Sequence, residues 1–236
     1  MNWKTTAQGI LERIYRRKLI QGIRILQAAT LEELGRPAFV ANVIRQIGLR
    51  FDRRSIYKGD NRHMNGFGPG LWQIPDQLAG ALIFLSQHPI QSALEIGTCD
   101  GWTVSVMAAY LRRFHPSLYF TTTDLAGRFT AHADVCRLLP IEYHSSRPAE
   151  EFAGTRFDLV FIDGDHSYNS VARDYQLLGK QAAICMFHDI DDCNVGYENV
   201  PKFWRELKAN EAGKSEFQEF IGPEGVMGIG LRVRKS

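Results

Sequence analysis

The sequence lacks a strong net charge, a long apolar run and a regular cysteine pattern. Over 236 residues the formal net charge is only +2, which argues against a dedicated nucleic-acid binder. The longest apolar run, Leu78–Leu85, is far shorter than the ~20 residues that a membrane helix needs. The four cysteines show no C-x-x-C spacing, which favours a reduced compartment. We therefore expect a cytoplasmic protein that has no transmembrane segment and binds no nucleic acid.

The N-terminus also lacks the pattern of a secretion signal, because Arg13, Arg16 and Arg17 interrupt its apolar residues and no small-residue cleavage site follows. A hydrophobic content of 44% and a charged content of 23% suit one globular domain, or one domain with a cap. The charge is unevenly distributed: residues 1–62 carry 13 Lys and Arg against 5 Asp and Glu, and the remainder carries 15 against 21. This asymmetry indicates a basic N-terminal part with a role of its own.

Helical patterns fill the first fifty residues. The spacing of five apolar residues predicts an amphipathic helix over about residues 7–28: Leu11, Tyr15, Leu19, Ile23 and Leu26. Thr30 and Glu33 form a capping-box pattern before a short second helix, and a third helix, over about 38–47, should end at Gly48. The apolar face of the first helix needs a partner, so a homodimer contact is one interpretation; docking on the acidic part, an anionic substrate and an anionic membrane surface are others.

The stretch from Leu49 to Pro75 has a loop-like composition. It is rich in glycine and carries basic and aromatic side chains: Arg53, Arg62, His63, Phe67 and Trp72. A long loop inside a compact domain is commonly a lid or a binding loop, although a structural connector with solvated arginines would have the same composition. We therefore assign residues 1–74 to a helical cap and lid segment.

Strand and helix patterns alternate from Pro75 onward. Apolar runs rich in β-branched residues are separated by helical patterns, and two final strands close the chain. Such alternation predicts an α/β domain over residues 75–236, with a parallel sheet and helices on both of its faces. Ligands bind such sheets at the carboxyl ends of the strands. The loops after the strands are therefore the places to look for chemistry.

A glycine-containing loop follows the first strand of this region. Gly97 and Gly101 allow the backbone to come close to a ligand, as in nucleotide-binding turns. Cys99 stands where the fingerprint G-x-G-x-x-G has its second glycine, so a ligand without a pyrophosphate fits better. Glu95 could bind an amine or a hydroxyl, and Asp124 stands where an acidic residue would bind a ribose diol. Alternatively, the glycines are only turn residues and Asp124 only caps a helix.

Two segments resemble motifs of the class I S-adenosylmethionine-dependent methyltransferases: LEIGTCDGWT is similar to their first motif and TTTDL to their second. The resemblance covers about residues 73–234 and implies a seven-stranded, mostly parallel sheet of order 3-2-1-4-5-7-6. It implies that the first loop lines the methionine and ribose part of the cofactor, that Asp124 holds the ribose hydroxyls and that Ser146 contacts the adenine. The cofactor-binding residues expected in all are Glu95, Gly97, Thr98, Gly101, Asp124, Leu125 and Ser146.

Two later strands end in acidic and imidazole side chains. The segment FDLVFIDGDHSY carries Asp163, Asp165 and His166, and AICMFHDIDD carries His188 and Asp189. Neighbouring parallel strands lie ~4.8 Å apart, so these groups converge if the two strands pair. Oxygen ligands with one imidazole suit a divalent cation such as Mg²⁺ or Mn²⁺, which would also relieve the repulsion between carboxylates. The alternative is that the acids cap helices and His166 fills a crevice.

The same pair of segments resembles a narrower group: metal-dependent O-methyltransferases that act on macrolide sugars and catechols, together with proteins called cephalosporin hydroxylases. This resemblance implies that Asp163, His188 and Asp189 are the metal ligands. In that group the base lies two or three residues after the first ligand, which points to His166 and, as second choice, to Asp165. A free imidazole has a pKa near 6.5 and can accept a proton at neutral pH.

The sequence therefore predicts an S-adenosylmethionine-dependent, divalent-metal-dependent O-methyltransferase acting on a hydroxyl of a small molecule such as a sugar or a natural product. A metal would lower the pKa of that hydroxyl, and His166 would remove its proton. A nicotinamide-dependent oxidoreductase shares the fold pattern, but Cys99 and the antiparallel-looking final strands count against it. A non-catalytic cofactor-binding protein would not need the acidic cluster. A metal-dependent hydroxylase would need an iron site that the sequence does not clearly show.

Overall fold

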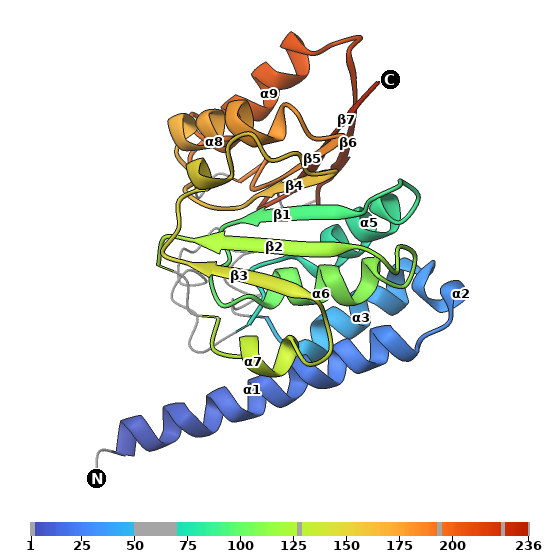
Figure 1. Cartoon of the computed structure of the whole chain (residues 1–236), viewed down its shortest axis with the longest axis vertical. Helices are drawn as coiled ribbons and strands as arrows, with labels where there is room; N and C mark the ends of the chain where they lie inside the picture. The colour runs from blue at the N-terminus through green and yellow to red at the C-terminus, as the bar shows by residue number, and fades with distance from the viewer. Residues whose placement is uncertain (1–2, 50–69, 127–128, 193–194, 223–224, 236) are drawn as a thin grey trace.

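A seven-stranded sheet forms the centre of the computed structural model, which describes residues 3–49, 70–126, 129–192, 195–222 and 225–235, with side chains described from Glu12 onward. The sheet order is β3-β2-β1-β4-β5-β7-β6 (Figure 1). The first five strands are parallel, whereas β7 runs antiparallel to both β5 and β6. The predicted order is thus confirmed. The strands are β1 Ser92–Ile96, β2 Tyr119–Asp124, β3 Ile141–Ser145, β4 Leu159–Ile162, β5 Ile184–His188, β6 Ser215–Phe220 and β7 Ile229–Arg234.

The N-terminal helices of the described residues 3–49 are α1 (Trp3–Ala28), α2 (Leu31–Leu34) and α3 (Pro37–Ile47). The predicted capping box starts α2, since the Thr30 amide donates to Glu33 Oε2 at 2.8 Å and the Glu33 amide donates to Thr30 Oγ1 at 3.2 Å. Helix α3 ends before Gly48, whose φ of 116° is readily adopted only by glycine. Local sequence signals thus set these boundaries correctly.

Two of the later helices are short or irregular. Helix α7 spans only four residues, and the chain enters β3 soon after it, following Pro140. Helix α8 is followed by a π-helical turn, in which the Lys180 amide donates to the Tyr175 carbonyl at 2.7 Å. The elements are α5 Pro75–Leu85, α6 Trp102–Leu111, α7 His132–Val135, α8 Tyr168–Asp174 and α9 Val200–Asn210, with a 3₁₀ turn at Ala149–Phe152 and the π turn at Tyr175–Gly179.

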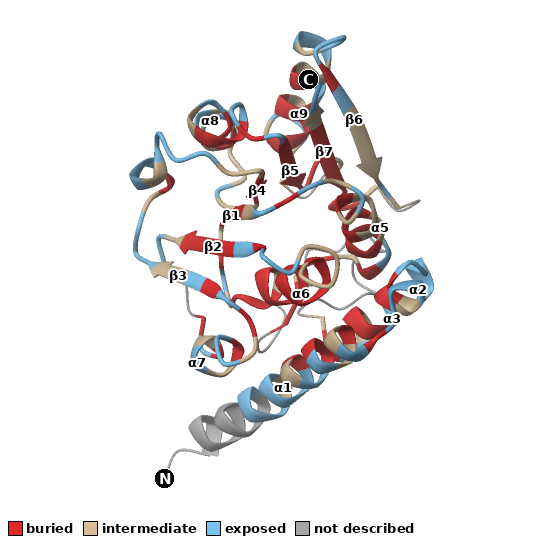
Figure 2. Cartoon of the chain, turned by 45° about the vertical axis from the view of Figure 1, so that its right-hand side comes forward, coloured by how far each residue is buried: buried red, intermediate tan, exposed pale blue. Residues whose placement is uncertain are grey.

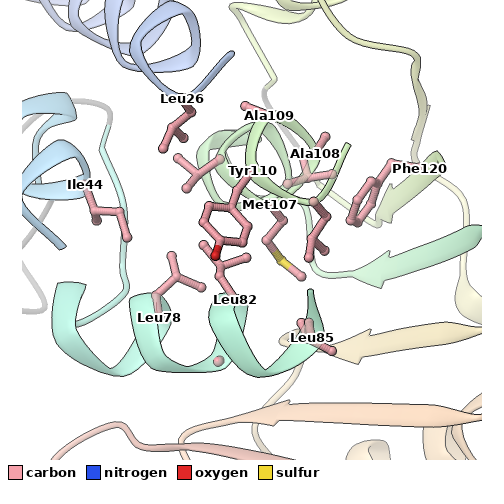
Figure 3. Packing of buried hydrophobic residues seen from close by; sticks show 14 of the residues in the cluster. Leu26, Ile44, Leu78, Leu82, Leu85, Met107, Ala108, Ala109, Tyr110 and Phe120 are labelled. Carbon is pink, nitrogen blue, oxygen red and sulfur yellow. The ribbon is translucent and has the colours of Figure 1, made fainter. Parts of the chain in front are cut away.

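Two hydrophobic cores lie on the two faces of the sheet. Alternate residues of each central strand point to opposite faces, so that Ala93 of β1 joins one core and Leu94 the other. The first core packs the sheet against α5 and α6, where Leu82, Met107 and Tyr110 lie together (Figure 3). The second core packs it against α8 and α9. The result is a three-layer arrangement with the strand ends accessible at one edge.

The N-terminal helices share the first of these cores. Leu19, Ile23 and Leu26 of α1 are fully buried, and α1 contacts both α3 and α6. Figure 2 shows the buried side of α1 turned toward α6 and its exposed side turned outward. The prediction of a homodimer rested on this apolar face lacking a partner, and within the described chain it has one. The boundary placed at residue 74 therefore does not interrupt the core.

The predicted lid falls largely outside the described residues. Arg53, Arg62, His63 and Phe67 belong to residues 50–69, and only the end of the segment, including Trp72, is described. That end is held by a bridge in which the Leu71 amide donates to the Gly48 carbonyl at 3.1 Å. No helix within the described ranges is long and apolar enough to cross a bilayer.

A buried hydroxyl links the N-terminal helices to the sheet domain and gives a first prediction. Tyr110 of α6 is fully buried and its hydroxyl donates to the Leu34 carbonyl at 2.8 Å. Tyr110→Phe leaves that carbonyl without its donor and should lower the free energy of unfolding by about 1–3 kcal/mol in urea denaturation. The matched control is Tyr119→Phe, at a tyrosine that is 43% exposed, which should change it by less than about 0.5 kcal/mol. Equal effects of the two variants would contradict the link.

Candidate functional site

A cavity of about 540 Å³ lies at the carboxyl ends of β1, β2, β4 and β5, the edge where the sequence predicts a ligand. Its volume is within the usual range for small-molecule sites. Loops after all four strands and the segment before α5 contribute to its wall. Its lining residues include Trp72, Gly97, Thr98, Cys99, Asp124, Leu125, Arg147, Asp163, Asp165, His166, His188, Asp189 and Met227.

The loop after β1 needs its glycines for two different reasons. Gly97 has a φ of 102°, and a Cβ there would lie 2.1 Å from the carbonyl oxygen of Asp163. The backbone of Gly97 therefore packs directly on the backbone of Asp163. Gly101 has a φ of 75°, and a Cβ there would lie 2.3 Å from the ring of Phe129. Of the described residues, Gly97 and Thr98 line the cavity, whereas Gly101 is required for packing behind it.

Asp124 is fixed at the end of β2 by two backbone amides. Its Oδ2 accepts from the Cys99 amide and its Oδ1 from the Ala126 amide, each at 2.7 Å. Each carboxylate oxygen can accept a further hydrogen bond, so the group can still bind hydroxyls in the cavity that it lines. Leu125 beside it is 69% exposed and lines the same cavity.

Besides Gly101, two further predicted cofactor contacts lie off the cavity wall. Ser146 is exposed, with a φ of 59°, and among the described residues it is Arg147 rather than Ser146 that lines the cavity. Glu95 is fully buried beneath the first loop, where Oε2 accepts from the Thr122 hydroxyl at 2.6 Å. Burial raises the pKa of Glu95 well above its ordinary value, against the opposing hydrogen bond from Thr122. Glu95 therefore supports the first loop from behind, whereas Ser146 lies outside the cavity wall.

Four side chains predicted from two strands converge into one cluster, which we call the acid–imidazole cluster: Asp163, His166, His188 and Asp189. His188 Nδ1 lies 3.1 Å from Asp163 Oδ1 and 3.3 Å from Asp189 Oδ1. His166 Nε2 lies 3.0 Å from Asp189 Oδ2 and 3.8 Å from Asp163 Oδ1. The convergence follows from the parallel pairing of β4 with β5, in which Ile162 lies beside Phe187. The expected meeting of these residues is therefore observed.

The carboxylates and imidazoles of this cluster shift one another's pKa. Burial opposes charge on each group, but the imidazoles hold the pKa of Asp163 and that of Asp189 below their ordinary values. Burial likewise opposes protonation of His166, yet its contacts with Asp163 and Asp189 raise its pKa to about 10. The pKa of His188 is raised in the same way. Two carboxylates in one buried site thus require compensating positive charge.

Asp165 differs from the cluster in its bonding. Its carboxylate accepts from the Ser167 amide at 3.0 Å and from the Ser170 hydroxyl at 2.8 Å, at the start of α8. These bonds lower the pKa of Asp165. A carboxylate so engaged is a weak proton acceptor, and this geometry favours His166 over Asp165 as the base.

Sequence analysis missed two buried glutamines that reach this edge from the N-terminal side. Gln73 is fully buried, and its Nε2 donates to Asp163 Oδ2 at 2.9 Å. Gln77, four residues later, donates to the Val226 carbonyl and accepts from the Gly228 amide at 3.0 Å. Gln73 thus holds the carboxylate of Asp163, and Gln77 holds the loop that contains Met227. A buried amide carries no motif, and only their position in an apolar stretch could have drawn notice.

Backbone strain is concentrated at the same edge. Within the described residues, positive φ values at non-glycine positions occur at Cys99, Ser146, Asp189 and Met227, and three of these four line the cavity. Asp189 has a φ of 59°, a conformation that costs free energy and persists only where surrounding contacts enforce it. Such strain is commonly found at functional sites.

The close approach of the two loops gives a second prediction. Gly97→Ala combines a strained φ with a backbone clash against Asp163, so it should destabilise the fold more than strain alone, which costs about 1–2 kcal/mol. The control is Gly154→Ala, because Gly154 has a similar φ of 89° and nothing within 4 Å of its added Cβ. Urea denaturation should place Gly97→Ala well below Gly154→Ala in stability. Equal midpoints would show that the loops do not touch.

Comparison with known proteins agrees with this geometry. Residues 94–190 match the model of a family described as "Methyltransferase domain". No curated protein sequence matches the chain. A solved O-methyltransferase from Bacillus cereus, in complex with S-adenosylhomocysteine, is 18% identical over 77% of this chain and 90% of its own, with a TM-score of 0.54. The O-methyltransferase TomG from Streptomyces achromogenes, involved in tomaymycin synthesis and bound to S-adenosylmethionine, is 18% identical over 78% and 91%, with a TM-score of 0.53.

The part of the chain that matches the family includes the first loop, Asp124 and the whole acid–imidazole cluster. The structural likeness covers more than three quarters of this chain. Residues 94–190 are therefore similar to a methyltransferase domain, and the chain has the fold of the class I S-adenosylmethionine-dependent methyltransferases.

Proposed function

We propose that the chain transfers the methyl group of S-adenosylmethionine to a hydroxyl oxygen of a small molecule, with a divalent cation bound at the acid–imidazole cluster. The observation that carries the proposal is a single cavity with two chemically different ends. One end presents Asp124 and the first loop, and the other presents two carboxylates and two imidazoles. A cofactor at the first end would direct its reactive group toward the second.

The cofactor end supports a ligand that carries hydroxyls but no phosphates. Asp124 is a fixed hydrogen-bond acceptor beside the exposed Leu125 side chain, and Gly97 and Thr98 form the floor of the cavity. Cys99 occupies the turn with a φ of 48°, and its amide is already used by Asp124. This amide is therefore not available to a pyrophosphate, as it would be in a dinucleotide site. The two similar structures hold S-adenosylmethionine and S-adenosylhomocysteine.

The donor set of the acid–imidazole cluster fits a divalent cation. Asp163, His166 and Asp189 each offer one ligand atom, and these atoms lie within 4.8 Å of one another. His188 Nδ1 lies against the same two carboxylates, so Asp163, His188 and Asp189 can serve as the ligands instead, as the resemblance implies, and His166 then remains available as the base. A mixed carboxylate and imidazole set favours Mn²⁺ or a similar transition metal over Mg²⁺, whose preferred ligands are all oxygens. A bound cation would supply Lewis acidity that lowers the pKa of a nearby hydroxyl.

His166 is the residue best placed to accept the proton of the acceptor hydroxyl. Its side chain is 40% exposed and lines the cavity, whereas His188 is only 4% exposed. Asp189 fixes its ring through the 3.0 Å contact with Nε2. Positive charge bound at the carboxylates would remove the stabilisation of the imidazolium, so that His166 becomes neutral and can act as base near neutral pH. Methyl transfer is an in-line displacement, so the chain must also align the acceptor oxygen with the methyl carbon and the sulfur of the cofactor.

The acceptor would lie between the acid–imidazole cluster and the part of the cavity wall formed by Trp72 and Met227. Trp72 and Met227 line the cavity and pack together with Val226 in a small apolar cluster of their own. Apolar surface with a few convergent polar groups is typical of small-molecule sites. A sugar or natural-product hydroxyl, presented on a partly apolar body, suits this wall. TomG, whose structure is similar, is an O-methyltransferase involved in tomaymycin synthesis.

Removal of one buried carboxylate tests the role of the cluster. Asp189→Ala should abolish Mn²⁺ binding and methyl transfer while leaving S-adenosylhomocysteine affinity nearly unchanged, because Asp189 lies at the opposite end of the cavity from Asp124. Calorimetry with Mn²⁺ and with S-adenosylhomocysteine measures the two affinities, and release of S-adenosylhomocysteine over a panel of hydroxylated natural products measures turnover.

The matched control is Asp191→Ala, two residues along the same loop, which among the described residues is not part of the cavity wall. It should retain both affinities. Full turnover of Asp189→Ala in the presence of EDTA would refute the metal site, and binding of NAD in place of S-adenosylhomocysteine by the native chain would refute the cofactor.

The ion pairs of His166 predict that the stability of the cation-free protein depends on pH. The folded-state pKa of His166 is raised from 6.5 to about 10, so its ion pairs stabilise the fold fully below pH 6.5 and this stabilisation is lost as the pH rises toward about 10. Urea denaturation in EDTA should show falling stability across this range, and His166→Asn should reduce the slope. An unchanged slope in this variant would show that His166 is not paired with the carboxylates.

A further inference from the structure

A second groove, of about 710 Å³, lies between α1 and the segment of α7, outside the catalytic cavity. Figure 1 and Figure 2 both show α7 alongside α1. The two walls are tied together by Gln27, whose Nε2 donates to the Leu138 carbonyl at 3.2 Å, and by an ion pair of Arg16 with Asp134. We call this feature the α1–α7 groove. Its lining residues are Arg13, Arg16, Arg17, Ile20, Gln21, Arg24, Asp134, Arg137 and Leu138.

The groove concentrates positive charge. Five arginines line it against a single carboxylate, that of Asp134, so it carries four charges in excess in a chain whose total is +2. Asp134 is shared by Arg16 and Arg137, the latter at 3.3 Å. Within the described ranges, Arg17 and Arg24 have no ion-pair or hydrogen-bond partner in the chain. These two guanidinium groups are therefore available to an external anion.

The arginines are arranged as a track and not as a scattered surface charge. Positions 13, 17 and 24 repeat at helical spacing, so their side chains leave α1 on one side and extend over roughly 16 Å of helix axis. Arg137 faces them from the other wall, just after α7. Guanidinium groups bind phosphate oxygens through paired hydrogen bonds, and several of them around one groove match a ligand with more than one phosphate.

We propose that the α1–α7 groove binds a small polyanion that carries two or three phosphate groups. The four excess charges are close to the charge of such a ligand, and the concave shape suits a discrete molecule. The site is separate from methyl transfer and does not rest on the proposed function. It gives the basic N-terminal part a role that neither the fold nor the catalytic cavity supplies.

Three other occupants fit the groove less well. A membrane surface would need a free apolar face on α1, but Leu19, Ile23 and Leu26 are buried in the core, and Ile14 is 44% exposed on its own. A second copy would bring the same arginine track against this one if α1 paired with α1, which like charges oppose. A nucleic acid would favour a broad basic surface, whereas the excess positive charge here lies within one groove.

The test is calorimetric titration of the full chain with sodium tripolyphosphate at ~0.15 M salt, where weak surface attraction is largely screened. The native chain should bind one equivalent. The double variant Arg17→Ala/Arg24→Ala removes the two unpartnered arginines without touching the core and should bind at least about tenfold more weakly. The matched control is Arg156→Ala, at an exposed arginine outside the groove, which should bind as the native chain does.

Melting curves of all variants should coincide in the absence of tripolyphosphate, which separates loss of binding from loss of folding. Equal affinity of the double variant and the Arg156→Ala control would overturn the proposal. So would binding to vesicles of anionic lipid, or to a duplex RNA, by a native chain that gives no heat with tripolyphosphate. Retained S-adenosylhomocysteine affinity in the double variant would show that the groove and the catalytic cavity are independent.

Discussion

Two buried carboxylates at neighbouring strand ends are the constraint on which the rest of this site depends. Asp163 and Asp189 are largely excluded from solvent at the ends of β4 and β5, and each is within 3.3 Å of His188 Nδ1. Like charges so close cannot both persist in a buried site without positive charge between them. Protons on the two imidazoles provide that charge in the cation-free protein, and a divalent cation can provide it in their place. Under the proposed function, the same arrangement decides when His166 can act as the base.

The surrounding structure keeps these carboxylates in position from several directions. The missing side chain of Gly97 lets the first loop rest on the Asp163 backbone, and Gln73 holds the Asp163 carboxylate from the N-terminal side. Asp189 is held in a left-handed conformation at the start of its loop. Leu71, two residues before Gln73, is buried in the core that α1, α3, α5 and α6 share, which anchors this segment. The N-terminal helices thus contribute to the geometry of the site.

Much of this could be predicted from the sequence, because the relevant signals are local. Strand patterns gave the sheet, and parallel pairing then required residues after β4 and β5 to meet, which located Asp163, His166, His188 and Asp189. The fold of the domain followed from the resemblance of the first two motifs. The contribution of Asp124 to the cavity wall followed in the same way.

The remainder depends on contacts between distant parts of the chain. Gln73 is 90 residues from Asp163, and no local pattern marks a buried amide. Glu95 and Gly101 occupy motif positions, yet only the packing of Thr122 and Phe129 shows that they support the loop from behind. The partner of the first helix proved to be the chain's own core, which sequence periodicity does not reveal. The arginines of α1 line a groove because the α7 segment lies opposite them, which the sequence of α1 alone does not reveal.

The most direct test of the central claim is a crystal structure of the chain with S-adenosylhomocysteine and Mn²⁺, with anomalous scattering used to locate the metal. We predict one Mn²⁺ peak between Asp163 and Asp189, with the ribose hydroxyls of S-adenosylhomocysteine on Asp124 and its sulfur directed toward the metal. A bound cofactor with no anomalous peak between these two carboxylates, or a peak elsewhere in the chain, would contradict the account.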